Sequence, residues 1–338
     1  MNASIPSPLR GMLAVCLLSL SGLGVADAQT TEAPEKPDGY PSRDITVMIP
    51  FGTGGGSDQM MRALGAEMAR IMGVDFRYTN KSGAGGLAAI PDFLVAPTDG
   101  YTLLQHHDAV VTGQAAGKHN LVIGENIVPI CIPQQDFSQL FINAEDDRFD
   151  DWESLVEYAQ ETGETLRVAA SSGQGSHEHS MVTLISEGSG IDLEVVPFGD
   201  PGERVSAILG QHVALYYDQP GEGRPYVEEG QLTPVLSIVE EAPDAFSHIP
   251  DLRDVGLEFN PTLKFRALWA SPEVPEERRD YLEAVCRQAA DSEGWQDYLE
   301  RTYTHLNSRF YGSEEGTEFA SQMLETYRTT FRDLGIID

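Results

Sequence analysis

The stretch IPFGTGGGSDQMMRALG, residues 49–65, joins an apolar strand pattern to a helix pattern through a run of small residues. At such a junction, backbone N–H groups and the positive end of the helix dipole bind an anion without any Lys or Arg. A tight turn without a ligand is the alternative. A second Gly-rich loop, NKSGAGG at residues 80–86, follows the next predicted strand. Two such loops on adjacent parallel strands would face one crevice, which favours the anion site.

The first third of the chain alternates strand and helix patterns. Strands are predicted over residues 44–51, 74–80 and 99–107, and helices over residues 57–73 and 87–97. Ser57 or Asp58 is expected to cap the first helix. This βαβαβ order predicts a parallel sheet with ligands at the C-terminal ends of its strands. Residues 165–190 repeat the order of strand, Gly/Ser loop and helix, so two α/β units built alike are expected.

Residues 1–28 have the pattern of a secretory signal peptide, with a basic start, an apolar core and a small-x-small cleavage site ending at Ala28. A membrane anchor and lipidation at Cys16 are the alternatives, but the apolar run is short for a span. Cleavage after Ala28 and export to a bacterial periplasm are therefore expected, with residues 29–42 as a flexible leader. Nucleotide cofactors are scarce outside the cytosol, and no cofactor is predicted.

Acidic residues far outnumber basic ones: Asp and Glu total 53, Lys and Arg total 22, and the formal net charge is −31. This excess argues against nucleic acid or an anionic membrane as a partner. It is compatible with a salt-loving source, which is a hypothesis about habitat and not about fold. Cys131 and Cys286 remain after processing. In an oxidising compartment they form either a disulfide or two buried thiols, and the sequence leaves both open.

The first Gly-rich stretch does not match the motifs of common enzymes. The dinucleotide fingerprint has a third Gly or Ala where Ser57 stands, and the next strand ends in Asn80 rather than in an acid. No Lys follows the glycines as in a P-loop, and the sequence has no G-x-S-x-G elbow. No nucleophile, base and acid stand out together. A binding protein rather than an enzyme is predicted.

Five motifs follow one another along nearly the whole mature chain: YPSRDITVMIPFGTGGGSDQMMRALG, NKSGAGG, PTDGYTLL, VAASSGQGSHEH and VPFGDPGERVSAILGQHVALYYD. In their order and spacing the chain resembles the periplasmic solute receptors of tripartite tricarboxylate transporters, also called Bug receptors. The resemblance implies an α/β, two-lobed periplasmic binding protein fold. Each lobe would hold a mostly parallel sheet flanked by helices, with the ligand cleft at the hinge. Lobe 1 is expected to comprise residues 43–132 and 245–338, and lobe 2 residues 133–244.

The resemblance also implies a function. The receptor would close on a small organic carboxylate, either a di- or tricarboxylate or an aromatic acid. As a monomer, it would deliver this ligand to the membrane subunits of a tripartite tricarboxylate-type transporter; delivery to a sensor kinase is left open. Loops 52–57 and 82–86 would hold a ligand carboxylate through backbone N–H groups, and loop 171–176 would close over the other end. The candidate ligand-binding residues are Phe51, Gly52, Thr53, Gly54, Gly55, Gly56, Ser57, Ser82, Gly83, Ala84, Gly85, Gly86, His106, His107, Ser171, Ser172, Ser176, His179, Arg204 and Asp218.

Several of these residues depart from the family's usual pattern. His106 and His107 stand where the family more often has Gly, Ser or Thr, and they lie either in the cleft or in the packed interior. Arg204 either contacts a distal carboxylate or is a solvated helix charge, and the solvated position is favoured. Asp218 either accepts a hydrogen bond from the ligand or fixes a loop.

The histidines also allow a different class of function. If His106, His107, Asp108, His177 and His179 converged across the cleft, they would form a metal site. The protein would then be a zinc-type metal receptor or a metallohydrolase. However, two histidines at i and i+2 do not form the i, i+4 pair of a helical metal motif. The carboxylate receptor is therefore preferred.

Four aromatic residues are expected near loop ends: Phe51, Phe198, Phe265 and Trp269. An aromatic wall built from them would favour an aromatic acid over a citrate-like ligand. For each residue, a place in the hydrophobic core is the favoured alternative.

Overall fold

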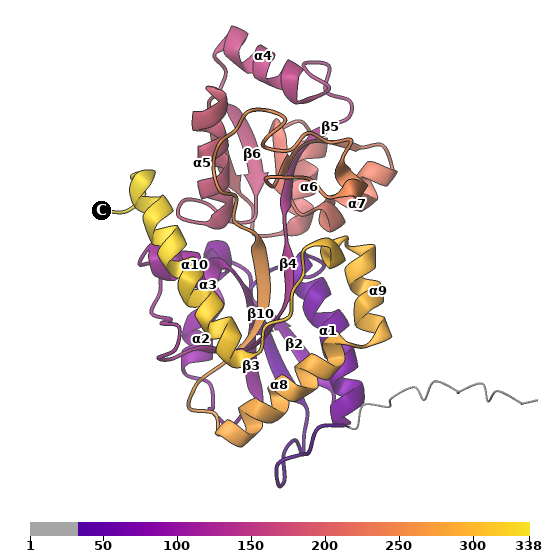
Figure 1. Ribbon diagram of the computed structural model, residues 1–338, viewed down its shortest axis with the longest axis vertical. Helices are drawn as coiled ribbons and strands as arrows, with labels where there is room; N and C mark the ends of the chain where they lie inside the picture. Colours follow the sequence, from indigo (N-terminus) through magenta and orange to yellow (C-terminus); the bar gives the residue numbers. More distant parts are fainter. Residues whose placement is uncertain (1–32) are drawn as a thin grey trace, which may run out of the picture. The chain divides into compact units, whose positions relative to one another are not determined.

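The computed structural model describes residues 33–338 (Figure 1). The predicted signal peptide, residues 1–28, lies outside the described residues, as does the start of the predicted leader. None of the helices within residues 33–338 is long and apolar enough to cross a membrane. The described part of the chain contains two five-stranded sheets, each with helices packed against it.

The first sheet has the strand order β2-β1-β3-β10-β4. Its strands are β1 (Ile45–Ile49), β2 (Phe76–Asn80), β3 (Thr102–His107), β4 (Val128–Asp136) and β10 (Lys264–Ala270). β1 pairs in parallel with β2 and β3, whereas β10 pairs antiparallel with both β3 and β4. The βαβαβ opening is therefore parallel as predicted. The complete sheet is mixed, because β10 comes from a distant part of the chain.

Helices cover both faces of this sheet (Figure 1). They are α1 (Gly56–Met72), α2 (Ile90–Leu94), α3 (Ala109–Ala115), α8 (Glu276–Ala290), α9 (Glu293–Arg301) and α10 (Ser313–Asp333). Apolar residues of α1, α8 and α9, such as Met60, Leu282 and Trp295, form one core cluster with the sheet. Residues of α3 and α10, such as Val110 and Tyr327, form a second cluster.

Cys131 on β4 and Cys286 on α8 form a disulfide, although they lie 155 residues apart in the sequence. Their Cα atoms are 6.6 Å apart, and both residues are fully buried in the cluster that α1, α8 and α9 share. The structure thus decides between the two possibilities that the sequence leaves open, and the bond ties α8 to the sheet.

The second sheet has the order β7-β6-β8-β5-β9 and repeats the directions of the first. β6 pairs in parallel with β7 and β8, and β5 pairs antiparallel with β8 and β9. Its strands are β5 (Ser138–Asn143), β6 (Leu166–Ala170), β7 (Leu193–Pro197), β8 (Leu215–Asp218) and β9 (Leu232–Ile238). The helices of this lobe are α4 (Trp152–Thr162), α5 (His177–Ser189), α6 (Pro201–Leu209) and α7 (Pro220–Glu228).

The chain passes from the first sheet to the second between β4 and β5, and it returns between β9 and β10 (Figure 1). Phe137, the residue between β4 and β5, is buried in a small cluster with Phe246 and Ile249 from the returning segment. Both crossings therefore share one apolar contact. The lobe boundaries expected at residues 132 and 245 stay a prediction.

Candidate ligand-binding site

Helix α1 begins with glycine and has no side-chain cap. Its N-cap is Gly55, and its first residue is Gly56. The expectation that Ser57 or Asp58 caps this helix is wrong, because the glycines carry the chain into the helix before those residues are reached. The Asp58 carboxylate instead accepts the Gly54 N–H at 2.9 Å. The N–H groups of the first helical turn have no partners within a helix, so they are available to another group.

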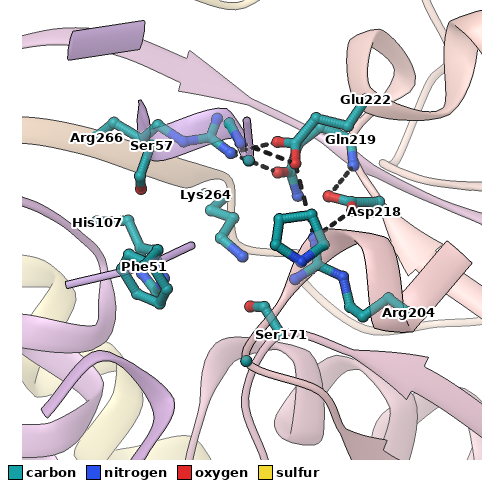
Figure 2. Close-up of a pocket in the computed structure, with 14 residues that line it drawn as sticks. Phe51, Ser57, His107, Ser171, Arg204, Asp218, Gln219, Glu222, Lys264 and Arg266 are labelled. Carbon is teal, nitrogen blue, oxygen red and sulfur yellow. Dashed lines mark hydrogen bonds and ion pairs between the residues drawn. The ribbon is translucent and has the colours of Figure 1, made fainter. Parts of the chain in front are cut away.

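A pocket lies at the start of α1, between loops of the two lobes (Figure 2). The first sheet's side supplies the end of β1, the start of α1, the end of β3 and the start of β10. The second sheet's side supplies the loop after β6, the start of α6, and the junction of β8 with α7. The lining residues are Phe51, Gly55, Gly56, Ser57, His107, Ser171, Gly199, Pro201, Arg204, Asp218, Gln219, Glu222, Lys264 and Arg266.

Arg204 is buried at this pocket. Its side chain is only 5% exposed, and its Nη2 lies 2.9 Å from Asp218 Oδ2. The favoured expectation of a solvated Arg204 is wrong, because the start of α6 packs against the other lobe: a Cβ at Gly55 would lie 2.9 Å from Pro201 Cγ. Burial opposes ionisation of Asp218, but Arg204 and Lys264 outweigh it and hold the pKa of this carboxyl below its usual range.

Two more cations line the pocket from β10. Lys264 Nζ lies 2.6 Å from Glu178 Oε1, and Arg266 Nη2 donates to Glu222 Oε1 at 2.5 Å. Arg266 also donates to Gln219 Oε1 at 2.8 Å. The three buried cations of the pocket, Arg204, Lys264 and Arg266, are therefore each paired with at least one carboxylate of the protein.

Three nitrogen atoms of the pocket residues nevertheless lack a partner among residues 33–338: Arg204 Nε, Arg266 Nε and His107 Nε2. Burial and then Lys264 lower the pKa of His107 well below its ordinary value, so the ring is neutral at pH 7. His107 Nδ1 accepts the Ala109 N–H at 3.0 Å, which leaves the ring proton on Nε2. All three atoms are then N–H donors. A buried donor without a partner costs about 1–3 kcal/mol, and a ligand that accepts from it removes this cost.

Glu222 connects the lobes across the pocket. Its Oε2 accepts the Gly56 N–H at 3.1 Å and lies 3.8 Å from Arg204 Nη2. We call the Gly56 N–H together with the side chains of Arg204 and Arg266 the anion site. Burial and then Asp218 raise the pKa of Glu222 above its ordinary value, against the effect of Arg266. In Figure 2, dashed lines connect Glu222 with its partners at this site.

The sequence reasoning missed Lys264, Arg266, Gln219 and Glu222. The sequence contains a signal for Lys264 and Arg266. They stand two residues apart in the strand KFRALWA, so their side chains share one face of the sheet. Two cations on one face of a strand that is otherwise apolar indicate a buried polar site. Glu222 stands in the segment QPGEGRP, which carries no such pattern. Only the packing of α7 against α1 brings it to the pocket.

The second Gly-rich loop does not line this pocket. Ala84 and Gly85 line a neighbouring pocket with Ser172 and Ser176 from the loop after β6. The hydroxyl of Ser176 is used there as the N-cap of α5, because it accepts the His179 N–H at 3.1 Å. The two Gly-rich loops thus line adjacent pockets rather than one.

Eight candidate residues line neither pocket. These residues are Gly52, Thr53, Gly54, Ser82, Gly83, Gly86, His106 and His179. Gly52 lies in the loop that packs against Pro201. His106 is fully buried, and its Nε2 is 3.2 Å from the Gly86 carbonyl oxygen. His106 therefore supports the second loop from behind rather than facing a ligand.

The structure gives the metal alternative no support. In the part of the chain that the structure describes, no three His, Cys, Asp or Glu side chains are arranged to hold a metal ion. Both ring nitrogens of His177 are engaged, since Nδ1 lies 2.8 Å from the Tyr327 hydroxyl and Nε2 lies 2.9 Å from the Tyr217 hydroxyl. His106 and His107 pack edge to face with ring centroids 5.3 Å apart, but among the described residues they do not join His177 and His179 in a metal-binding group.

The aromatic residues divide between pocket and core. Phe51 lines the pocket and stacks on His107, with ring centroids 4.2 Å apart (Figure 2). Phe265 and Trp269 are fully buried in the core that α3 and α10 cover, and Phe198 packs against the core of the second lobe. Only Phe51 offers an aromatic surface at this site.

Comparisons with known proteins identify a family and a fold. The family described as "Tripartite tricarboxylate transporter family receptor" matches residues 60–323. Protein BugT of Bordetella pertussis is 25% identical over 244 residues, which cover 71% of this chain and 74% of BugT.

MatC from Rhodopseudomonas palustris with bound malate has a TM-score of 0.75 at 22% identity, covering 86% of this chain and 99% of MatC. An R. palustris protein with adipate has a TM-score of 0.76 at 19% identity, covering 87% of this chain and 96% of that one. Both structures share the two-lobed periplasmic binding protein fold with this chain.

Proposed function

Because this chain belongs to the tripartite tricarboxylate transporter receptor family, we propose that it binds a small organic carboxylate at the anion site. The family consists of solute receptors and not of enzymes, so the function is binding and release without a chemical step. One observation carries the proposal: the uncapped start of α1 opens on a pocket whose buried residues retain unpartnered N–H donors on Arg204, Arg266 and His107.

The ligand carboxylate accepts hydrogen bonds from Gly56 and from Arg204 Nε and Arg266 Nε. Each bond to a charged group contributes about 1.5–3 kcal/mol, and the start of a helix contributes about 0.3–1 kcal/mol. A Kd of about 1 μM requires about 8 kcal/mol. Three such bonds therefore suffice for a receptor that must release its cargo. The negative charge of the whole protein opposes the ligand little, since salt screens charges beyond about 8–10 Å.

The rest of the ligand lies against Phe51, His107 and Ser171. These side chains offer one aromatic face, one N–H donor and one hydroxyl group. Malate and adipate, which are bound to the two structural relatives, are both small dicarboxylates, and this supports a ligand of that class here. We therefore infer a small mono- or dicarboxylate as the ligand. The neighbouring pocket at Gly85 and Ser172 is the place for a distal carboxylate.

The partners follow from the family. A receptor of this kind passes its ligand to the membrane subunits of a tripartite tricarboxylate-type transporter, and the expected signal peptide places it in the periplasm. Delivery to a sensor kinase is the alternative that the sequence leaves open. Both partners would recognise the lobes with the ligand bound.

The direct test is a thermal-shift screen of the purified receptor with malate, adipate, citrate, benzoate and Zn²⁺, each with and without a chelator. We expect at least one carboxylate to raise the Tm saturably whether or not chelator is present, since a ligand that binds only the native state stabilises it. Stabilisation by Zn²⁺ alone, abolished by the chelator, would contradict the proposal. So would the absence of any shift with all four acids.

A further inference from the structure

A side chain of the protein already occupies the anion site. Glu222 lies in the first turn of α7, in the lobe of the second sheet, whereas Gly56 and Arg266 belong to the lobe of the first. Its two carboxylate oxygens contact the Gly56 N–H at 3.1 Å and Arg266 Nη2 at 2.5 Å. The same carboxylate lies 3.8 Å from Arg204. It therefore occupies the Gly56 N–H that the proposed function assigns to the ligand, and it contacts the Nη2 atoms of the two arginines whose Nε atoms the ligand would use (Figure 2).

Glu222 and Arg266 fill the space next to Gly56 at the start of α1. A Cβ placed on Gly56 would lie 2.0 Å from Glu222 Oε1 and 2.1 Å from Arg266 Nη2. No room remains at the start of α1 for a second carboxylate next to that of Glu222. A ligand carboxylate can reach the Gly56 N–H only if the Glu222 side chain turns away.

We propose that Glu222 competes with the ligand, so that its carboxylate fills the anion site of the empty receptor and is exchanged for the ligand's carboxylate on binding. The inference rests on the proposed function and deepens it, because it names the residue that sets the affinity of this site for acids. The exchange is one of hydrogen bonds and ion pairs, and no covalent bond changes.

The space behind Glu222 is lined by polar residues but is small, with a volume of about 10 Å³, so it must widen to take the displaced carboxylate. Behind Glu222 lies a second small pocket, which shares Gly56, Gln219, Glu222 and Arg266 with the first. Its other lining residues are Gln59, Gln134, Asp136, Gly221, Tyr298, Thr302 and Thr304. Glu222 thus separates two cavities, and a rotation of its side chain moves the carboxylate from one toward the other.

The charged groups around Glu222 determine whether its carboxylate is protonated after it has been displaced by the ligand. The charged and titratable groups that act on Glu222 come from every element around it: Arg266 and Lys264 on β10, Arg204 on α6, Asp218 at the end of β8, Asp136 on β4 and Tyr298 on α9. Arg266 and Arg204 then hold the ligand, so the displaced Glu222 keeps fewer cationic partners and stays buried close to Asp218, whose pKa is held below its usual range. Asp136 adds little negative charge, because burial raises its pKa well above its usual range. A buried carboxylate beside like charges takes up a proton.

Ligand binding is then coupled to the uptake of one proton from solvent. Between the pKa of Glu222 in the empty receptor and its higher pKa in the complex, each bound ligand brings up to one proton to the protein. Affinity therefore rises as the pH falls, by up to about tenfold per pH unit. The raised pKa of Glu222, caused by burial and Asp218, moves this window toward neutral pH.

The test is calorimetric titration of malate and adipate into three proteins: wild type, Glu222→Gln and Glu229→Gln. Gln keeps the shape of Glu but is a weaker partner for Arg266. Glu229 lies at the end of the same helix and is exposed, so Glu229→Gln makes the same charge change away from the pocket. At about pH 8 we expect Glu222→Gln to bind at least about tenfold more tightly than wild type. Its affinity should be nearly independent of pH, whereas Glu229→Gln should follow wild type.

A second measurement needs no variant. Titrations of wild type in two buffers with different heats of ionisation give the number of protons taken up per ligand, which should approach one at about pH 8. Equal affinities of wild type and Glu222→Gln, weaker binding by Glu222→Gln, or no proton uptake would contradict this inference while leaving carboxylate binding intact. If neither acid binds to any of the three proteins, the proposed function fails for these acids, and the inference fails with it.

Discussion

The two lobes contain the same junction twice, with opposite outcomes. β1 leads into α1 through residues 50–55, and β6 leads into α5 through residues 171–176. Each strand is second in the order of its sheet, and each loop is rich in Gly. The start of α1 has no side-chain cap, whereas Ser176 caps α5 by accepting the His179 N–H. At the first junction the Gly56 N–H has its partner, Glu222, in the other lobe, whereas at the second junction the His179 N–H has its partner, Ser176, in the same loop.

The acidic residues at the two helix starts also differ, since one belongs to its own helix and the other comes from the opposite lobe. α5 carries its own acid, Glu178, in its first turn, and Lys264 holds it at 2.6 Å. Burial opposes ionisation of Glu178, but the ammonium group of Lys264 outweighs burial and lowers the pKa of this carboxyl below its usual range. α1 instead receives the carboxylate of Glu222 from the other lobe. We therefore propose that a missing side-chain cap and an exchangeable acid, rather than the number of glycines, open a helix start to a ligand.

We expect the largest effect on carboxylate affinity from a variant that fills the space at the start of α1. In Gly56→Ala, the added methyl group would occupy the space next to the Gly56 N–H, where it would meet Glu222 and Arg266. The helix itself tolerates Ala at this position. We expect carboxylate affinity to fall by about 100-fold or more, since one or two charge-assisted bonds of about 1.5–3 kcal/mol are lost. Calorimetry measures this loss, and circular dichroism checks that the fold is retained.

Gly199→Ala is the matched control for that variant. Gly199 lines the same pocket, but a Cβ there would meet nothing within 4 Å. Its affinity should stay within about twofold of wild type, because no bond of the anion site is disturbed. If Gly56→Ala also bound carboxylates like wild type, the two junctions would not differ in function.

A smaller effect, on stability, is expected when the side-chain cap of α5 is removed. Ser176→Ala removes the cap of α5 and should lower the free energy of unfolding by about 1 kcal/mol. Urea denaturation measures this change. Ser189→Ala is the control at the other end of α5, where the hydroxyl donates to the Ile185 carbonyl, and it should cost less than about 0.5 kcal/mol. Equal stabilities of the two variants would show that the cap on α5 contributes nothing.

The sequence predicted the first junction well, because its signals are local. An apolar strand, a Gly-rich loop and an amphipathic helix follow each other within residues 44–73, and the structure has β1 and α1 there. The resemblance to the family supplied the two-lobed fold, which the comparisons with solved structures confirm. The sequence does not decide between a disulfide and two thiols, because the spacing of two cysteines does not say which elements pack together.

The charged part of the pocket was harder to predict. Arg204 stands in the first turn of an amphipathic helix, a position that is usually solvated, and only the contact of α6 with the other lobe buries it. Glu222 and Arg266 lie 44 residues apart and in different lobes, so no periodicity connects them. The burial and pairing of these charged residues depend on how distant elements pack against each other. Local sequence patterns do not predict that packing.

The most direct test of the central claim is a titration of the ¹⁵N-labelled receptor with adipate, followed by the backbone amide signals at the two helix starts. A carboxylate that binds at α1 perturbs the N–H groups it contacts. We predict the largest shift at Gly56, with smaller shifts at His177 and His179. Shifts that are largest at the start of α5, or saturable binding that leaves the Gly56 signal unmoved, would contradict the account.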